Sequence, residues 1–436
     1  MSSRNIVILT SANPFLTSGK TVLDIKESLS RTNNVTIISR RYFKSQKNIL
    51  SLESKLIFYK DKFIRKLNSI FFKKFKVFFD KQKADVNYYM FSYKNHLEKK
   101  FINKVLKKIP NNTDIIVYIF CVDFLNDEEI FIINEKKNIP IIRIMIDMAE
   151  ITGGCHFAWD CEGYLKNCGN CPGLFSKDPN DLTYQNLFLK KKYINKTNLN
   201  IVAASNQQFR QLKQSSAYAN VNKFKVLLPT TESIFYNQNK VKSKVFFNLP
   251  LDKKIILFGA VTTSEKRKGG EELIEALAYL KANYPKKIID NLHLIIAGNS
   301  LISASGLDGF NYTTLGYLSY EQLAKAYNAA DFYLCTSIQD SGPSMINQSL
   351  SCGTPVISFD IGVSRDLILN NKTGLIVEYK NTKKFAEAIS NMVKKSRIEL
   401  KEMENNCLLI AKKKCSYQSF YNDFSKIINS IIDDNK

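Results

Sequence analysis

The stretch of this chain best suited to chemistry is Gln339–Phe359, which reads QDSGPSMINQSLSCGTPVISF. A helix that begins near Pro343 directs its free N–H groups and the positive end of its dipole toward the preceding loop, which suits a phosphate. Asp340 lies in that loop, and Gln348 lies about one and a half turns inside the helix. These residue types can contact the sugar and the ribose of a nucleotide-sugar. An ordinary helix-to-strand connection without a ligand explains the pattern equally well.

The same stretch resembles the donor-binding motif of family 4 retaining glycosyltransferases. Asp340 matches the first acid of that motif, and the residues from Cys352 to Val356 match its Cys-Gly-Thr-Pro-Val end. Gln348 stands where a second Glu is usual, so an oxygen acceptor is kept without the charge. The resemblance implies that Gln348 holds the ribose and Asp340 the sugar. It also adds the neighbouring donor-binding candidates Ser341, Gly342, Ser344 and Met345.

A second candidate site follows an apolar strand in Ile255–Gly270, IILFGAVTTSEKRKGG. Arg267 and Lys268 stand just before a predicted helix, where cations are unfavourable unless an anion is present. Preorganised cations stabilise the charge that develops on a departing diphosphate. In the family pattern, Gly259 and Lys268 match, whereas Ala260 stands where Arg is usual. We expect Arg267 to supply that charge; solvated lysines at a helix start are the alternative.

Further donor-binding candidates come from the resemblance and from strand ends. Ligands of open α/β sheets bind at the carboxyl edge of the strands. Asn299 and the backbone around Tyr317 and Leu318 are expected to hold the nucleotide base. Gly19 and Lys20 are expected to approach the donor phosphates. A phosphate-binding GxxxxGK[ST] loop of an NTPase is disfavoured there, because Pro14 occupies its first glycine position.

Four cysteines follow closely in ITGGCHFAWDCEGYLKNCGNCPGL, with the spacing C-x5-C-x6-C-x2-C. Cys155, Cys161, Cys168 and Cys171 can satisfy a tetrahedral zinc ion of structural type. An iron–sulfur cluster, a redox pair at Cys168 and Cys171, and unligated thiols remain alternatives. Similar clusters after Thr-Gly-Gly occur in a subgroup of the same glycosyltransferase family, and the transfer itself is expected to need no metal.

Asp147 ends an apolar strand where the resembling enzymes often carry a His-Asp pair, and Ile146 here replaces the histidine. Asp147 is therefore a candidate to orient or deprotonate an acceptor hydroxyl. A strand-end Asp that caps the next turn is an equal alternative. With only three histidines in the chain, a Ser-His-Asp hydrolase is disfavoured.

The composition is that of a cytoplasmic globular protein with an acidic partner. The 436 residues carry 63 Lys+Arg against 40 Asp+Glu, and no signal peptide or membrane span is recognisable. Nucleic acid is disfavoured because no recognised module is present. Residues 41–110 hold 19 Lys+Arg and 5 Asp+Glu with interleaved aromatics. This segment predicts either a peripheral helix on an anionic membrane surface at the inner leaflet or a helix packed in the domain core.

Short apolar runs alternate with helical patterns in two series, which predicts parallel sheets covered by helices. The expected fold is α/β with two Rossmann-like domains facing a cleft. Residues 1–220 form an acceptor domain with the basic insertion at 41–110 and the cysteine cluster at 155–171. Residues 221–415 form the donor domain. Residues 416–436 form a helix that, by the resemblance, crosses back to the first domain.

Together, the resemblance implies a GT-B enzyme of hexosyltransferase type that uses a UDP- or GDP-sugar and retains the anomeric configuration. The acceptor is expected to be a saccharide or a lipid-linked precursor of a bacterial surface polysaccharide. In this mechanism a phosphate oxygen takes the acceptor proton, so little protein acid–base chemistry is required. A sugar-nucleotide epimerase of the same fold and a non-catalytic basic binding protein are the alternatives.

Overall fold

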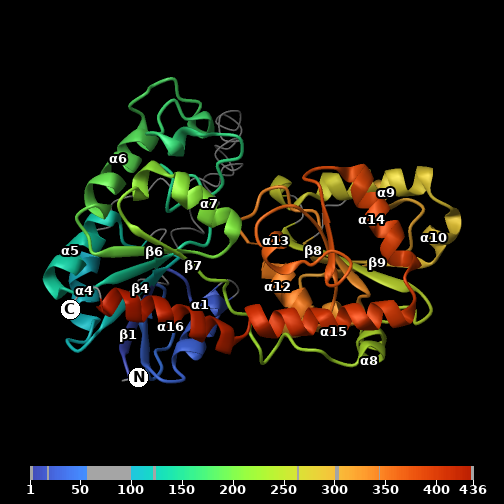
Figure 1. Ribbon diagram of the computed structural model, residues 1–436, viewed down its shortest axis with the longest axis horizontal. Coiled ribbons are helices and arrows are strands. Elements are labelled where there is room, and N and C mark those ends of the chain that lie inside the picture. The colour runs from blue at the N-terminus through green and yellow to red at the C-terminus, as the bar shows by residue number, and fades with distance from the viewer. Residues whose placement is uncertain are drawn as a thin grey trace. The chain divides into compact units, whose positions relative to one another are not determined.

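The computed structural model describes residues 3–16, 19–55, 100–120, 124–262, 265–299, 304–342 and 344–433. The chain divides into two compact units, each built on one parallel sheet (Figure 1). Unit 1 comprises Met1–Ala204, Gln208–Leu228 and Phe420–Lys436, and unit 2 comprises Ser205–Gln207 and Pro229–Ser419. The α/β architecture with two parallel sheets, expected from the sequence, is confirmed.

Unit 1 contains a seven-stranded sheet with the strand order β3-β2-β1-β4-β5-β6-β7. Its strands are β1 (Asn5–Thr10), β2 (Asn34–Ser39), β3 (Ile49–Ser51), β4 (Ile115–Ile119), β5 (Ile141–Ile144), β6 (Leu199–Ala203) and β7 (Asn222–Lys225). Its helices are α1 (Lys20–Leu29), α4 (Lys100–Lys108), α5 (Asp127–Lys137), α6 (Leu182–Ile194) and most of α7 (Asn206–Gln214). The chain returns to this unit in α16 (Tyr417–Asp433).

Two apolar cores cover the two faces of the unit 1 sheet, because successive side chains of a strand point to opposite faces. Ile6 and Ile8 of β1 pack in a core with residues of α1 and α16, whereas Val7 and Leu9 pack in a core with residues of α4, α5 and α6. Phe420 and Phe424 anchor α16 in the first core, fully buried. The predicted return of the C-terminal helix to the first domain is thereby confirmed (Figure 1).

Unit 2 contains a six-stranded sheet with the order β10-β9-β8-β11-β12-β13. In chain order within this unit, the arrangement is 3-2-1-4-5-6, the order of a Rossmann fold. The strands are β8 (Lys254–Thr262), β9 (Leu292–Asn299), β10 (Tyr312–Gly316), β11 (Phe332–Cys335), β12 (Val356–Phe359) and β13 (Gly374–Val377).

Helices cover both faces of the unit 2 sheet. In Figure 1, α9 (Gly270–Asn283), α10 (Lys286–Asp290) and α14 (Thr382–Lys394) lie together on one side. On the other side lie α8 (Lys240–Phe246), α12 (Ser344–Ser351) and α15 (Arg397–Lys414). The remaining helices are α11 (Tyr320–Ala329), which contacts α8 and α12, and the short α13 (Ser364–Leu367).

The division between the units lies later in the chain than the predicted boundary at residue 220. β7 pairs in parallel with β6, with Asn200 opposite Asn222, and therefore completes the first sheet. Its residues are half-buried or exposed, as befits an edge strand, so they lack the apolar run by which the other strands were recognised. The helix expected to begin near Pro343 starts at Ser344 among the described residues, and Pro343 itself lies outside them.

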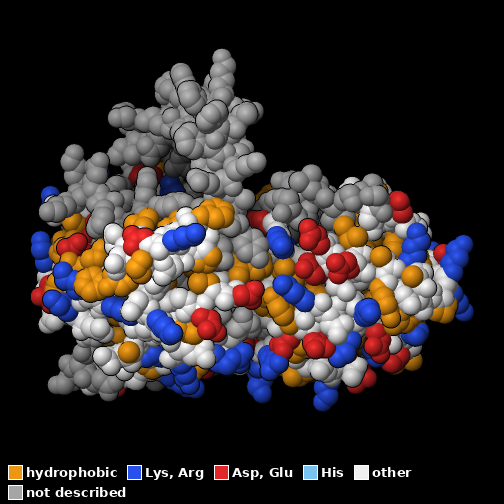
Figure 2. Space-filling model, turned by 90° about the horizontal axis from the view of Figure 1, so that it is seen from above, with side chains coloured by type: hydrophobic (Ala, Val, Ile, Leu, Met, Phe, Trp, Pro, Cys, Tyr) orange, Lys and Arg blue, Asp and Glu red, His pale blue; other side chains and the backbone are white. Residues whose placement is uncertain are grey.

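Most of the basic aromatic segment at residues 41–110 falls in 56–99, outside the described residues, so its predicted membrane contact stays a prediction. No helix in the described part of the chain combines the length and the hydropathy of a membrane-spanning segment. Figure 2 shows one face of the molecule, where lysine and arginine side chains are interspersed with acidic and apolar ones across the described residues.

Candidate functional site

The candidate site of unit 2 lies where the strand order reverses. β8 and β11 are hydrogen-bonded neighbours in parallel, so the loops after their carboxyl ends meet at one edge of the sheet. This edge, at the point of reversal, is where open α/β sheets bind ligands. The loop after β8 leads to a 3-10 turn at Lys266–Lys268, and the loop after β11 leads to α12.

Backbone hydrogen bonds hold these two loops together. The amides of Ile338 and Gln339 both donate to the Arg267 carbonyl, at 2.8 Å and 3.2 Å. The Thr336 hydroxyl donates to the Lys268 carbonyl at 3.2 Å. Gly269 allows this contact, because its φ is +69° and a Cβ there would come within 1.7 Å of the Thr336 carbonyl oxygen. The 3-10 turn is therefore held at a fixed place beside the second loop.

The result is a cluster of three charged side chains that the sequence predicted separately. Lys268 Nζ lies 2.6 Å from Asp340 Oδ2, and an Arg267 guanidinium nitrogen lies 3.2 Å from the same oxygen. The Gly342 amide donates to the other oxygen, Asp340 Oδ1, at 3.1 Å. Glu265 forms an additional ion pair with Arg267 at 2.7 Å. Both cations thus already face one anion in the structure.

Asp340 is buried, and burial alone would raise the pKa of its carboxyl group. Lys268 and Arg267 outweigh burial, and the pKa lies below its ordinary value of 3.8. The carboxylate is therefore charged at neutral pH. Asp340 and Glu265 together balance the charges of Arg267 and Lys268, so an incoming anion has to displace one of these carboxylates from its cation. The expected roles of these three residues in donor binding remain predictions.

The first turn of α12 contributes the next group of predicted residues. Met345 lies beside Gly259 on β8, because a Cβ at Gly259 would come within 3.1 Å of Met345 Cε. The carbonyl of Ser341 accepts a hydrogen bond from the Ser205 hydroxyl at 2.8 Å. Ser344 is exposed at the start of the helix. Of these predicted residues, Met345 of α12 is thus placed beside Gly259 of β8.

Gln348 is buried one turn further along α12, and its carbonyl oxygen Oε1 lies 3.4 Å from the Tyr327 hydroxyl. The fully buried Tyr327 belongs to α11, and the hydroxyl of Thr354 donates to its backbone carbonyl at 2.8 Å. Tyr327 is a neighbour of Gln348 that sequence reasoning missed. Its position in an apolar helical pattern gave no sign of a polar contact.

The other predicted donor residues lie on other elements of unit 2 or in unit 1. Asn299 ends β9, and its side chain is outside the described set. Tyr317 is exposed and Leu318 half-buried in the loop between β10 and α11. Gly19 caps α1 in unit 1, with Lys20 next to it. A Cβ at Gly19 would come within 1.9 Å of the Asn13 carbonyl oxygen, so this turn requires glycine.

In unit 1, Asp147 follows β5 and binds a histidine that the sequence did not associate with it. Asp147 Oδ2 lies 2.7 Å from His156 Nδ1, and Asp147 Oδ1 accepts the Ala149 amide at 2.8 Å. Burial tends to lower the pKa of His156, but Asp147 outweighs burial and raises it above its ordinary value of 6.5. The expected strand-end histidine is missing, yet an imidazole reaches the same carboxylate from nine positions later.

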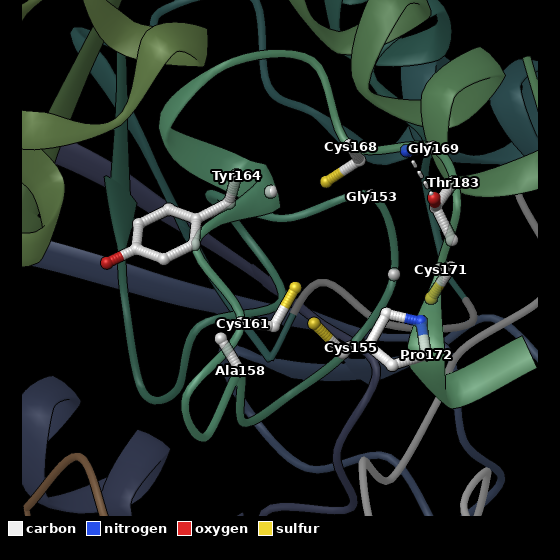
Figure 3. A pocket seen from close by; sticks show the side chains of 12 residues that line it. Gly153, Cys155, Ala158, Cys161, Tyr164, Cys168, Gly169, Cys171, Pro172 and Thr183 are labelled. Atoms are coloured by element: carbon white, nitrogen blue, oxygen red, sulfur yellow. Dashed lines mark hydrogen bonds between the residues drawn. The ribbon is translucent and has the colours of Figure 1, made fainter. Parts of the chain in front are cut away.

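All four predicted cysteine ligands line one pocket of unit 1, with an empty volume of about 360 Å³ that includes open solvent. Figure 3 shows their sulfur atoms directed into this pocket, from the turns between Gly153 and Pro172. Each of these cysteines is free. That they hold a metal remains a prediction.

Comparison with known families supports a glycosyltransferase family over the second half of the chain. Residues 240–411 match the family model described as "Glycosyl transferases group 1". This range contains the candidate site of unit 2. The predicted resemblance is therefore confirmed over this range at the level of group 1 glycosyltransferases, and the subgroup with a cysteine cluster stays a prediction.

Curated relatives match the chain only in part. A D-inositol 3-phosphate glycosyltransferase from Arthrobacter sp. (strain FB24) is 26% identical over 167 residues, which cover 36% of this chain and 38% of that protein. The protein of the same name from Rhodococcus erythropolis is 34% identical over 73 residues, or 17% of this chain and 16% of that protein. The matched region thus spans well under half the length of these relatives.

Solved structures match almost the whole chain. A sucrose-phosphate synthase from Thermosynechococcus elongatus superposes with a TM-score of 0.67 at 13% identity, covering 99% of this chain and 100% of that one. A glycosyltransferase from Rickettsia africae gives 0.66 at 16% identity, with 99% of both chains covered. Anabaena HepE, solved in complex with UDP-glucose, gives 0.62 at 14% identity, covering 98% and 99%. At such identities the likeness concerns the fold, and it confirms the predicted GT-B class.

Proposed function

We propose that this protein is a retaining glycosyltransferase that moves a sugar from a nucleoside-diphosphate sugar to a hydroxyl group of a saccharide or lipid-linked acceptor. The observation that carries the proposal is the cluster of Arg267, Lys268 and Asp340. It lies at the point of strand reversal in a Rossmann-type sheet, within the residues that match the glycosyltransferase family model.

The diphosphate of the donor binds Arg267 and Lys268 beside the amino-terminal end of α12. Two fixed cations and a helix amino terminus are complementary to the charge of a phosphate group. They favour the reaction because negative charge grows on the diphosphate as its bond to the sugar breaks. Asp340 and the amides near Gly342 then contact the sugar and β-phosphate, and Gln348 binds the ribose.

In the reaction, the bond between the anomeric carbon and the β-phosphate oxygen breaks, and the acceptor oxygen bonds to the same carbon on the same face. The acceptor proton passes to the departing phosphate oxygen. This course leaves little proton transfer to protein side chains. Asp147, which contacts His156, is the candidate of unit 1 for orienting the acceptor hydroxyl.

The donor class is a UDP- or GDP-sugar, and the solved Anabaena complex with UDP-glucose supports a nucleotide-sugar in this fold class. The acceptor class fits the synthesis of a bacterial surface polysaccharide. The basic aromatic residues of 41–110 would keep such an enzyme at the anionic inner leaflet of the membrane, where lipid-linked acceptors are found.

The donor is tested by thermal unfolding against a panel of UDP-, GDP- and ADP-sugars, because a ligand of the native state raises the unfolding temperature. The stabilising donor is then incubated with and without acceptors. Release of nucleoside diphosphate with a retained glycosidic product supports transfer. An epimerised donor formed without acceptor indicates an epimerase, and donor binding without any turnover indicates a binding protein.

The role of the cations is tested with Lys268→Ala. The loss of one preorganised charge at the departing phosphate costs about a hundredfold or more in kcat/KM. Lys266→Ala is the matched control, because it removes the same charge from the exposed side of the same 3-10 turn. Equal rates for Lys268→Ala and the wild type would reject the proposed role.

A further inference from the structure

The pocket of unit 1 gathers four cysteines around a space that the transfer chemistry does not use. Cys155, Cys161, Cys168 and Cys171 line it together with four glycines, Ala158, Tyr164, Pro172 and Thr183 (Figure 3). Cys161 Sγ and Cys168 Sγ both lie close to Gly163, since a Cβ there would be 3.5 Å and 3.9 Å from them. Four sulfurs from separate turns thus share one pocket.

The Cys168–Cys171 turn has a tightly fixed backbone. Cys168, Gly169 and Asn170 have φ angles of +56°, +85° and +46°. A Cβ at Gly169 would come within 2.1 Å of the Pro179 carbonyl oxygen, so the middle position requires glycine. The amide of Gly169 donates to the Thr183 hydroxyl at 3.0 Å, and the amide of Cys171 donates to Asp181 at 2.9 Å. The turn is therefore fastened to the start of α6.

Backbone amides also face the sulfurs. The amides of Gly173 and Leu174 are hydrogen-bonded to Cys171, and the amide of Gly153 is hydrogen-bonded to Cys168. Burial raises the pKa of Cys168 to about 11 and also raises the pKa of Cys171, and these amides act against that effect only in part. Lys190 and Lys191 of α6 also interact electrostatically with Cys168. A cation in the pocket would supply the positive charge that a buried thiolate needs.

We propose that Cys155, Cys161, Cys168 and Cys171 together bind one structural Zn²⁺ ion. Four cysteine ligands with no open position are the donor set of structural tetrahedral zinc sites. On binding, the four thiols lose four protons to solvent and the Zn(Cys)₄ group carries two negative charges, next to the two lysines of α6. Among the described residues, no three ligand-type side chains are already spaced for a metal, so the sulfurs close around the ion.

The zinc site would also fix the Asp147–His156 pair. His156 directly follows Cys155, and its carbonyl accepts the Met148 amide at 2.9 Å. The loop from Asp147 to His156 is thus closed by one backbone hydrogen bond and by the 2.7 Å contact of the two side chains. A metal at Cys155 anchors the outgoing end of this loop. The inference does not depend on glycosyl transfer.

The test is the metal content of the purified full-length chain, followed by replacement of zinc with Co²⁺. The expected result is one zinc per chain and, with Co²⁺, the visible absorption of tetrahedral thiolate coordination. Cys168→Ala/Cys171→Ala is expected to lose both signals. Cys407→Ala, at a buried cysteine of α15 in unit 2, is the control and keeps them.

The wild type alone also decides the question if the double variant does not fold. A chelator is expected to lower the unfolding temperature of the wild type, and added Zn²⁺ to restore it. A wild-type chain without zinc that shows no Co²⁺ signal overturns the inference. Bound iron in place of zinc also overturns the inference. A disulfide between Cys168 and Cys171 overturns it as well, if alkylation and mass spectrometry detect that disulfide while the other thiols are still reduced.

Discussion

The carboxylate of Asp340 lies between Arg267 and Lys268, where the donor diphosphate is proposed to bind. Replacing Asp340 with Asn separates its effect on stability from its effect on diphosphate binding. Both cations contact the same oxygen, at 3.2 Å and 2.6 Å. They therefore lie within about 6 Å of each other, where two unit charges repel by about 3 kcal/mol at an effective dielectric constant of about 20. Asp340→Asn keeps the shape of the side chain but removes the one carboxylate that both cations contact, and Glu265 remains beside Arg267.

We expect Asp340→Asn to lower the free energy of unfolding by about 3 kcal/mol in the absence of ligand, within the range known for breaking buried ion pairs. The same variant is expected to bind a free nucleoside diphosphate at least about tenfold more tightly, because the diphosphate no longer competes with a carboxylate. Turnover of the sugar donor is expected to fall, since the contact of Asp340 with the sugar is lost.

Urea unfolding and calorimetric titration with the nucleoside diphosphate measure the two effects. Asp360→Asn is the control, because it removes a carboxylate from the more exposed pair with Arg365 in the same unit. The reasoning is refuted if Asp340→Asn binds the diphosphate no more tightly than the wild type. That result would mean that the two cations do not form the diphosphate site.

Three further predictions follow from the described contacts. The pKa of the Asp340 carboxyl group is lower in the folded protein than its value of 3.8 in the unfolded chain. The ion pairs of Asp340 therefore stabilise the fold fully above pH 3.8, and this stabilisation is lost as the pH falls through the lower folded pKa. Urea unfolding at about pH 5 and about pH 3 should thus show that the free energy of unfolding falls less with acid for Asp340→Asn than for the wild type; an equal fall in both proteins contradicts the pairing. Gly269→Ala should destabilise unit 2 more than Gly316→Ala, because both glycines have positive φ but only Gly269 meets a backbone oxygen; equal stabilities by urea unfolding would exclude the close contact. Asp147→Asn should lower the pKa of His156, measured by an NMR titration of the histidines, and an unchanged pKa would contradict their ion pair.

The sequence predicted the fold because its strands are apolar runs separated by helical patterns. The helices Gly270–Asn283 and Tyr320–Ala329 and the apolar strand Phe332–Cys335 follow this alternation in the second series. β7 was not predicted, because Asn222–Lys225 is an edge strand without an apolar run. The domain boundary expected before it depended on that missing strand.

The site could be predicted residue by residue, but not as an arrangement. Arg267 and Lys268 were chosen for a diphosphate and Asp340 for a sugar, and their mutual contact depends on β8 and β11 being neighbours in the sheet. The distance along the chain between these loops carries no such information. Likewise, the pairing of His156 with Asp147 depends on how the intervening loop turns, which residue spacing alone does not specify.

The most direct test of the account is a crystal structure with the nucleoside-diphosphate sugar that stabilises the protein. The account predicts the diphosphate within hydrogen-bond distance of the side chains of Arg267 and Lys268, near the first turn of α12, with Lys268 shifted from Asp340 toward a phosphate oxygen. A diphosphate bound at another place, with Lys268 still paired to Asp340, would contradict it.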